Sequence, residues 1–321
     1  MSRNRWKKII SCMLACCLAG TLLGCTPGAS EPEQPKLVLT IGTADSGGTM
    51  YPVGSAIAEV LNSDDVKVNL SASTGSAMNA RNLISGEVDL GLVSGDTALD
   101  AYQNPEGTGQ GLRAIGAVFI SQSNWLAPED KGLVYVHDLG GKRLGVGPEN
   151  SNTEISAMSS MKATGICKEE TTVHNCSLVA GEDMVLEDEL DAIHGFAGTP
   201  IGALSHLADA TPCRILKYTQ EELDRILNEY GSVFIPVVLP AGTYRGQDED
   251  VDTFGVKCLL CVKDTTDEDL VYYLAQKLWE GRSELAEIHP STGMMEDKEF
   301  IFEDLTIPLH PGAQRFYDSI R

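Results

Sequence analysis

One pattern recurs along this chain: an apolar run of strand length, a short turn of small polar residues, and an amphipathic run of helix length. The three clearest cases are "IGTADSGGTMYPVGSAIAEVLN" at 41–62, "NLSASTGSAMNARNLISG" at 69–86 and "RLGVGPENSNTEISAMSSMKATG" at 143–165. Strands and helices that alternate in this way are typical of α/β folds with mostly parallel sheets. Such sheets bind ligands beyond the carboxyl ends of their strands, which is where these turns lie.

The same alternation continues along most of the chain. The predicted strands are residues 37–42, 66–71, 88–93, 112–119, 144–147, 172–179, 190–196, 214–218, 233–239 and 255–262. The predicted helices are residues 52–61, 76–85, 97–102, 152–164, 182–186, 221–229 and 268–288. Two segments, 123–132 and 234–247, have the proline-containing character of hinges between lobes.

The first turn places Gly47, Gly48 and Thr49 between a strand and a helix whose first turn contains Pro52. Free N–H groups and the positive end of the helix dipole point out of such a turn, and glycine lets a ligand approach the backbone. The turn therefore predicts a cradle for a carboxylate or phosphate. A tight turn without a ligand is the alternative.

The other junctions repeat this arrangement with different polar residues. Ser73, Thr74, Gly75 and Ser76 form the second turn, and in the third turn Ser151 and Glu154 have the spacing of a capping box. A fourth junction carries Ser94, Gly95 and Asp96, where Asp96 either pairs with a ligand ammonium group or caps the following helix. A fifth, "FAGTPIGAL", offers Gly198 and Thr199 as donors.

The first 24 residues have the character of a targeting segment. Arg3, Arg5, Lys7 and Lys8 precede an apolar stretch at 9–23, which is short for a membrane span. The stretch ends in "LLGC", which resembles a bacterial lipobox and would leave Cys25 as a lipid-modified N-terminus. A plain secretory signal or a membrane anchor is the alternative. The Pro-rich residues 25–36 suit a tether.

Composition narrows the class of partner. Apolar residues make up 42% of the 321 residues and charged residues 22%, as in globular proteins. Removing residues 1–24 leaves 20 Lys and Arg against 46 Asp and Glu, a formal charge of −26. This charge argues against nucleic acid and anionic lipid surfaces as partners.

No catalytic or metal-binding constellation is predicted. Motifs such as GxSxG, HExxH and a P-loop are absent, and the six histidines do not pair at helical ligand spacing. Cys258 and Cys261 have CxxC spacing, but "VKCLLCVK" reads as a buried strand whose positions i and i+3 face opposite ways. Cys167 and Cys176 either form a disulfide or stay free. No enzyme activity and no cofactor are therefore expected. Trp125 is either a cavity wall or packed core.

Several of these motifs resemble one family, the TAXI-type solute-binding proteins of TRAP transporters. The matching stretches are "IGTADSGGTMYPVG", "STGSAMNARNLISGEVDLGLV", "LGVGPENSNT", "PAGTYRGQDEDV" and "IPLHPGAQRFY", which together cover the chain from residue 37 to its end. The resemblance implies an α/β, two-lobed periplasmic-binding-protein fold of type II with hinge strands. We therefore expect a signal peptide at 1–24, a tether at 25–36, one lobe from 37–125 plus 240–321, and a second lobe from 126–239.

The resemblance also implies a function. The chain would capture a small organic acid, an amino acid or carboxylate of glutamate-like type, between its lobes and deliver it to a sodium-coupled TRAP permease. It would lie outside the cytoplasm, held at the membrane by the lipid on Cys25. The ligand-binding subunit of a signalling receptor is the alternative. The expected ligand-binding residues, from the turns and the resemblance together, are Gly47, Gly48, Thr49, Tyr51, Thr74, Gly75, Ser76, Asn79, Ser94, Asp96, Asn152, Thr153, Gly198 and Thr199.

The chain departs from the family pattern at the turns. Ser94-Gly95-Asp96 stands where a Gln-Ser-Asp triplet is common, and Asn150 and Asn152 stand where glycines are common. Glu154 occupies a position that often holds a basic residue. Because these changes touch the predicted pocket, the ligand need not be the usual glutamate-like one.

Overall fold

The computed structural model describes residues 37–104, 111–167, 169–231 and 233–321, which fall within one compact unit. The predicted signal peptide, Cys25 and the tether lie outside the described residues. Within the described ranges, none of the helices combines the length and the apolar character that a membrane span requires.

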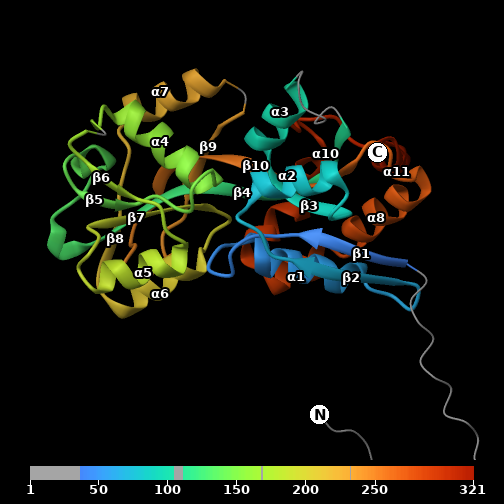
Figure 1. The fold of residues 1–321 in the computed structure, drawn as a ribbon, viewed down its shortest axis with the longest axis horizontal. Helices are drawn as coiled ribbons and strands as arrows, with labels where there is room; N and C mark the ends of the chain where they lie inside the picture. Colours follow the sequence, from blue (N-terminus) through green and yellow to red (C-terminus); the bar gives the residue numbers. More distant parts are fainter. Residues whose placement is uncertain (1–36, 105–110, 168, 232) are drawn as a thin grey trace, which may run out of the picture. The chain divides into compact units, whose positions relative to one another are not determined.

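The order of elements follows the predicted alternation (Figure 1). The strands are β1 (Leu37–Gly42), β2 (Val66–Ser71), β3 (Leu90–Ser94), β4 (Leu112–Pro128), β5 (Arg143–Gly145), β6 (Thr172–His174), β7 (Ala192–Ala197), β8 (Cys213–Ile215), β9 (Ile235–Leu239) and β10 (Val251–Lys263). The helices are α1 (Met50–Leu61), α2 (Ser76–Ser85), α3 (Gly95–Gln103), α4 (Asn152–Thr164), α5 (Leu178–Leu186), α6 (Gly202–Ala210), α7 (Gln220–Tyr230), α8 (Glu268–Glu280), α9 (Arg282–Ile288), α10 (Lys298–Phe302) and α11 (Pro311–Ile320). Short 3₁₀ segments are η2 (Glu129–Lys131), η3 (Val136–Leu139) and η4 (Pro290–Glu296).

The strands form one mixed sheet with the order β2-β1-β3-β10-β4-β7-β5-β6, in which β8 pairs with β4 and β9 with β10. Pairing is parallel among β1, β2 and β3 and again among β5, β6 and β7. The pairs that involve β4 and β10 are antiparallel. The expectation of mostly parallel pairing is therefore wrong for the middle of the sheet, where two long strands run in opposite directions.

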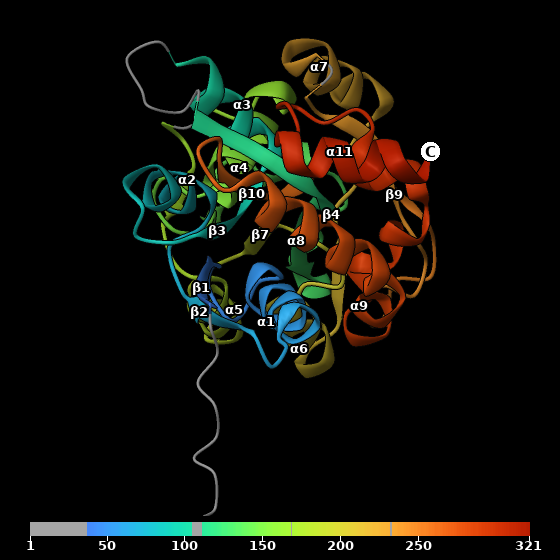
Figure 2. The same ribbon diagram turned by 90° about the vertical axis from the view of Figure 1, so that its right-hand side faces the viewer.

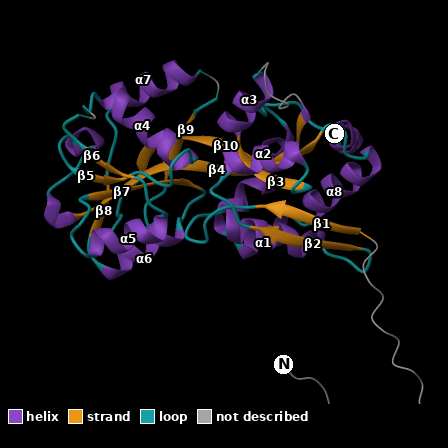
Figure 3. Ribbon diagram, viewed as in Figure 1, coloured by secondary structure: helices purple, strands orange, loops and turns teal. Residues whose placement is uncertain are grey.

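The long strands β4 and β10 join two groups of strands. In Figures 1 and 3 they extend from β1–β3 toward β5–β8, and they pair with each other from Leu112 to Gln122. Residues of β4 up to Ile120 pack in one hydrophobic core, which we call the first core, and Trp125 packs in another, the second core. On β10 the change falls between Val256 and Cys258. Each long strand therefore contributes buried side chains to both cores.

The first core contains β1–β3, the ends of β4 and β10 just described, and the helices that cover them. Figure 2 shows α1, α8, α9 and α11 around these strands. Ile57 of α1, Leu274 of α8 and Tyr317 of α11 are buried there. The apolar face of α1 at helical spacing, which the sequence indicates, thus packs against the sheet.

The other end of the sheet has a core on each face. Trp125 of β4 and Phe196 of β7 belong to the second core, whereas Leu126 and Ile193, on the same strands, belong to a third core with α5 and α6. Side chains alternate between faces along a strand, so one strand serves two layers. Trp125 is thus packed core, beside His194, with ring centroids 4.5 Å apart.

The sequence pattern predicted the bounds of several helices and strands correctly and those of others incorrectly. The strands β1 and β2 and the helices α2 and α4 have the predicted bounds. The predicted strand at 172–179 is right for its first three residues and wrong beyond them, because β6 ends at His174. Ser177 then caps α5, its hydroxyl accepting a bond from the Ala180 N–H. The helices α6, α10 and α11 were not predicted. The five described cysteines are free thiols, including Cys167 and Cys176.

Candidate functional site

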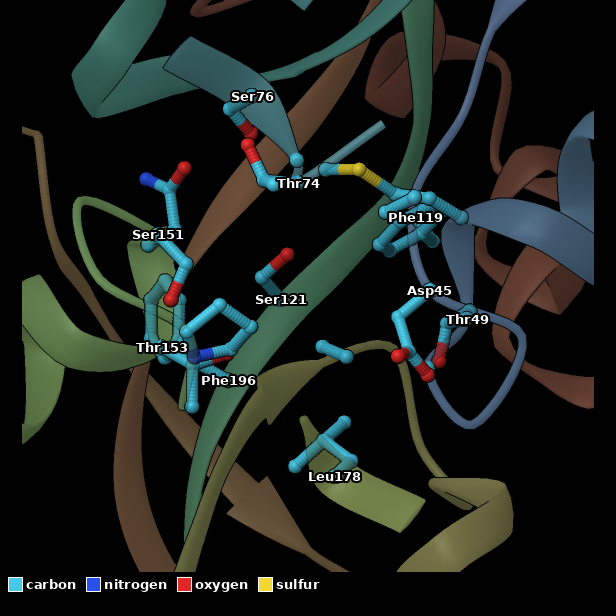
Figure 4. A pocket seen from close by; sticks show the side chains of 17 residues that line it. Asp45, Thr49, Thr74, Ser76, Phe119, Ser121, Ser151, Thr153, Leu178 and Phe196 are labelled. Carbon is cyan, nitrogen blue, oxygen red and sulfur yellow. The ribbon is translucent and has the colours of Figure 1, made fainter. Parts of the chain in front are cut away.

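A cavity lies at the carboxyl ends of the parallel strands β1, β2, β5 and β7. Its volume is about 60 Å³. Segments from both ends of the sheet line it: Ala44, Asp45, Gly48, Thr49, Met50, Thr74, Gly75, Ser76, Phe119, Ser121, Pro148, Ser151, Asn152, Thr153, Leu178, Phe196 and Ala197. Figure 4 shows Asp45 and Thr49 on one side, Ser151, Thr153 and Phe196 on the other, and Ser121 between them.

The glycine turn before α1 forms the first wall. The Asp45 carboxylate accepts a hydrogen bond of 2.7 Å from the Gly47 N–H, and the Asp45 carbonyl accepts one of 3.1 Å from the Gly48 N–H. A Cβ at Gly47 would lie 2.7 Å from Val179 of α5, so this glycine allows a close approach between chain segments. At Gly48 the nearest atoms would be 3.5 Å away, so Gly48 keeps the cavity open.

The second wall is the turn before α2. Gly75 has φ of +117°, a conformation that favours glycine, and its N–H donates to the Ser73 hydroxyl at 2.9 Å. Ser76, the first residue of α2, accepts a bond of 2.9 Å from the Ser94 N–H through its hydroxyl oxygen. The hydrogen bond between Ser94 and Ser76 holds the start of α2 against the end of β3.

The third wall is the start of α4. Ser151 is the N-cap, and its hydroxyl accepts a bond of 3.2 Å from the Glu154 N–H. The Glu154 carboxylate accepts bonds from the Asn150 N–H at 2.6 Å and from the Asn175 side chain at 2.8 Å, and Glu154 does not line the cavity. Gly147, with φ of +89°, would place a Cβ 2.6 Å from Thr153. The predicted capping role of Ser151 is confirmed, but Glu154 does not complete a capping box, because its carboxylate accepts from the Asn150 N–H and not from that of Ser151.

The helices α1, α2 and α4 therefore begin at one cavity, and Leu178 adds the start of α5 to its lining. Among the described residues, the backbone N–H groups of Thr49, Met50, Ser76, Asn152 and Thr153 have no hydrogen-bond acceptor within the protein. Unpaired N–H groups at helix starts carry partial positive charge. The convergence of α1, α2 and α4 thus makes a site suited to an anionic group.

The rest of the lining is apolar apart from one hydroxyl. Phe119 and Ser121 come from β4, Phe196 from β7 and Leu178 from the start of α5. Ser121 is 1% exposed, and its hydroxyl has no partner among the described residues. An open groove lined by Glu149, Asn175 and Cys176 adjoins the cavity, and it shares Asp45, Thr74 and Pro148 with it.

A buried chain of hydrogen bonds supports the start of α4. The Nδ1 of His194 lies 3.1 Å from the Thr153 carbonyl, and Nε2 lies 3.0 Å from the Ser123 hydroxyl. A carbonyl only accepts, so Nδ1 carries the proton and Nε2 accepts from Ser123. Tyr218 joins Ser123 to Ser160 with oxygen distances of 2.8 and 2.7 Å. Burial lowers the pKa of His194 to about 3, which keeps the ring neutral.

Asp96 does not line the cavity but links α3 to α4. Both of its carboxylate oxygens accept bonds of 2.9 Å from the Asn152 side chain, and one accepts from the Ser94 hydroxyl at 2.6 Å. Burial raises the pKa of Asp96, against the opposing effect of these hydrogen bonds. The Asp96 carboxylate thus forms its hydrogen bonds within the protein. It links α3, which packs in the first core, to α4, which packs in the second.

The structure brings seven of the predicted site residues to the cavity and places the other seven elsewhere. The cavity contains Gly48, Thr49, Thr74, Gly75, Ser76, Asn152 and Thr153; Gly47, Tyr51, Asn79, Ser94, Asp96, Gly198 and Thr199 do not line it.

The residues outside the cavity have other contacts. Asn79 is fully buried and donates to the carbonyls of Thr43 and Leu92. Gly198 accepts a hydrogen bond from the Thr49 hydroxyl through its carbonyl, and the Thr199 hydroxyl accepts one from Gln122 at 3.1 Å. Tyr51 is 38% exposed. Asn79, Gly198 and Thr199 thus hold the segments around the cavity together without lining it.

Several lining residues were missed by the sequence analysis. Asp45 lies within the quoted glycine turn, and its carboxylate two residues before Gly47 is the signal that was overlooked. Phe119, Ser121 and Phe196 lie on strands, where no local motif distinguishes a cavity residue from a core residue. In the part of the chain that the structure describes, no group of three or more His, Cys, Asp or Glu side chains has the geometry of a metal site.

Comparisons with known proteins agree with this architecture. A model of the NMT1-like family matches residues 41–319. The chain is similar to an ancestral arginine-binding protein bound to arginine, with 14% identity, a TM-score of 0.50, and 79% of this chain and 97% of that chain covered. It is also similar to the ligand-binding component of an ABC-type import system from Staphylococcus aureus, determined with zinc bound, with 13% identity, a TM-score of 0.50 and coverage of 88% and 84%. The predicted two-lobed periplasmic-binding-protein fold is confirmed.

Proposed function

Because the chain belongs to the NMT1-like family and has the fold of periplasmic binding proteins, we propose that it is a solute-binding protein for a small organic acid. The observation that carries the proposal is the cavity at which α1, α2 and α4 begin. Their unpaired N–H groups replace water around a carboxylate without the reorganisation that solvent requires. A surface charge of −26 does not oppose this, because local dipoles act at short range whereas the surface charge is screened.

Binding is coupled to closure of two lobes in this proposal. We assign residues 37–125 and 240–321 to one lobe and 126–239 to the other. On β4 the change of core, between Ile120 and Trp125, lies close to this division. On β10 it lies between Val256 and Cys258, so Val251 and Phe254 pack in the cores of the second lobe. The Thr49 hydroxyl donates to the Gly198 carbonyl, and the Ala203 N–H donates to the Gly47 carbonyl at 3.2 Å, so contacts between the lobes surround the cavity. The described conformation is therefore the closed one.

The N-terminal motifs and the motif resemblance together suggest where the protein acts and to what it delivers its ligand. We propose that the protein acts outside the cytoplasm, is held at the membrane by a lipid on Cys25, and delivers its ligand to a TRAP permease without a catalytic step or a cofactor. The motif resemblance supports this TAXI assignment. Delivery of the closed form to a signalling receptor is the alternative, and uptake of labelled ligand by cells with and without a TRAP permease separates the two.

A ligand titration tests the binding function directly. The purified full chain is titrated calorimetrically with amino acids, dicarboxylates, 2-oxo acids and short fatty acids, and its unfolding temperature is measured with each. A ligand at 100 times its dissociation constant stabilises the folded state by about 2.7 kcal/mol. Saturable binding of one acid, with a matching rise in unfolding temperature, supports the proposal. The absence of binding by every acid contradicts it.

A further inference from the structure

The charge of the cavity lining restricts which acids the site accepts. Of the lining residues, Asp45 alone carries an ionisable side chain, and neither Lys nor Arg is among them. A carboxylate placed here must be held by the helix starts, since no lining cation compensates it. A second carboxylate on the same ligand would be desolvated beside apolar side chains, at a cost of several kcal/mol when it is unpaired.

Asp45 gives the start of α1 a negative charge within the cavity that the starts of α2 and α4 do not have. Its Oδ1 accepts the Gly47 N–H at 2.7 Å, so a negative charge already stands at the start of α1. Oδ2 has no donor among the described residues. The starts of α2 and α4, which offer the N–H groups of Ser76, Asn152 and Thr153, have no carboxylate in the cavity beside them. Outside the cavity, the carboxylates of Glu154 and Asp96 bond to Asn150 and Asn152 at the start of α4. Within the cavity, the walls at α2 and α4 therefore offer N–H groups without a carboxylate, and Asp45 is the negative point.

A buried hydroxyl and the small volume complete the description. The Ser121 side chain is almost fully buried and is aimed into the cavity between the walls that carry Asp45 and Thr153 (Figure 4). Phe119, Phe196 and Leu178 provide apolar contacts. The cavity volume of about 60 Å³ favours a small ligand.

We infer that the ligand is a small neutral amino acid, bound as its zwitterion. Its carboxylate is held by the helix starts of α2 and α4, its ammonium group by Asp45 Oδ2, and its short side chain by Phe119, Phe196 and Leu178. Ser121 bonds to the carboxylate from the floor of the cavity. This inference rests on the proposed function, and it differs from the glutamate-like ligand that the family resemblance implies.

A matched panel of small molecules separates the charge requirements. The full chain is titrated calorimetrically with L-alanine, L-serine and L-valine, with lactate, which has a hydroxyl in place of the ammonium group of alanine, and with L-glutamate and succinate. We expect the neutral amino acids to bind at least tenfold more tightly than lactate, and glutamate and succinate to bind more weakly than alanine. Glutamate or succinate binding as tightly as the neutral amino acids overturns the inference.

The variant Asp45→Asn isolates the ammonium contact. Its side-chain oxygen still accepts the Gly47 N–H, so the turn is retained while the charge is lost. We expect affinity for L-alanine to fall about tenfold to a hundredfold, since a hydrogen bond to a charged group is lost, and affinity for lactate to stay the same or rise. Glu149→Gln, which removes one negative charge from the adjoining groove and not from the cavity, is the control and leaves both affinities unchanged.

The outcomes distinguish this inference from the function on which it rests. Unchanged alanine affinity in Asp45→Asn, with the circular dichroism spectrum of the native protein, overturns the inference and leaves acid binding intact. A native chain that binds none of the six molecules, nor any other acid, contradicts the proposed function, and the inference fails with it.

Discussion

At the scale of single residues, two adjacent glycines have different roles. Gly47 lets the α1 turn approach Val179 of α5, whereas at Gly48, which lines the cavity, an added Cβ would have no atom closer than 3.5 Å. Sequence alone treats the pair as one feature, because both satisfy the same turn. Only the packing of α5 against the turn separates them.

The variant Gly48→Val tests this assignment. The added methyl groups occupy the cavity, so we expect ligand affinity to fall at least tenfold while the unfolding temperature without ligand changes little. Gly293→Val, at an exposed position with no neighbour near its Cβ, is the matched control and keeps full affinity. Equal affinity in both variants, measured by calorimetry, would count against the cavity as the binding site.

His194 makes a second prediction at this scale, in its effect on stability against pH. Its pKa is about 3 in the folded protein and about 6.5 when unfolded. The unfolded chain therefore binds a proton that the folded chain does not, and stability is lost as pH falls from 6.5 toward 3. Between pH 7 and 5 the loss is about 2 kcal/mol from this residue.

The variant His194→Gln provides the comparison. Glutamine retains a donor and an acceptor but does not titrate, so its stability, measured by urea unfolding, should fall about 2 kcal/mol less than that of the native protein between pH 7 and 5. His206→Gln, which changes an exposed histidine, is the control and should follow the native protein. Parallel pH curves for all three proteins would rule out this role for His194.

At the scale of elements, helix starts both stabilise the fold and form the proposed site. Ser151 caps α4 at the cavity, and Thr219 caps α7, away from the cavity, with Glu222 completing a capping box. Replacing either with alanine removes one acceptor for an N–H of the first turn. Each loss costs about 1 kcal/mol of stability.

The pair Ser151→Ala and Thr219→Ala therefore separates stability from binding. We expect similar decreases in the free energy of unfolding for the two variants, by urea denaturation. Ligand affinity should fall only in Ser151→Ala, because the α4 N–H groups that face the cavity lose their fixed position. If Thr219→Ala weakens binding equally, the effect is one of general stability.

The same scale shows what the sequence could predict. The bounds of β1, β2, α2 and α4 followed from local signals. These signals are the periodic spacing of apolar residues, the turns of small polar residues, the N-cap Ser151, and the glycines that end the helices. The start of α5 was missed because "TTVHNCSLV" has strand character throughout, and only the turn at Asn175 and Cys176 breaks it. Phe119 and Ser121 were missed because their place depends on the pairing of β4 with β10, which joins residues far apart in the sequence.

At the scale of the whole molecule, α3 and α4 connect the two lobes through side chains. Asn152 donates to both oxygens of Asp96 and contacts the Thr97 hydroxyl, with an Nδ2–Oγ1 distance of 2.9 Å. Ala98 of α3 lies in the first core and Ala157 of α4 in the second. This contact therefore favours the closed conformation without touching the ligand.

The variant Asp96→Ala should open the molecule. Without the carboxylate, Asn152 loses two of its hydrogen bonds to α3 and keeps only its contact with Thr97. We therefore expect a larger radius of gyration by small-angle X-ray scattering and weaker ligand binding. Asp96→Asn, which keeps an acceptor, should lie between this variant and the native protein. Asp188→Ala removes ion pairs to Lys131 and Arg143, outside the first core, and should not change the radius. An unchanged radius in Asp96→Ala would contradict the role of this contact.

The place of Phe119 and Ser121 on β4 has a kinetic consequence. Because β4 is one continuous strand shared by both lobes, the floor of the cavity stays in place when the walls separate. Ligand dissociation then proceeds in two stages. The helix starts of α1, α2 and α4 first move away from the ligand, and the ligand that remains bound to β4 is then replaced by water. Dissociation measured by stopped flow would accordingly depend on solvent viscosity in its first stage, as expected for a diffusive domain motion, and on ligand chemistry only in its second.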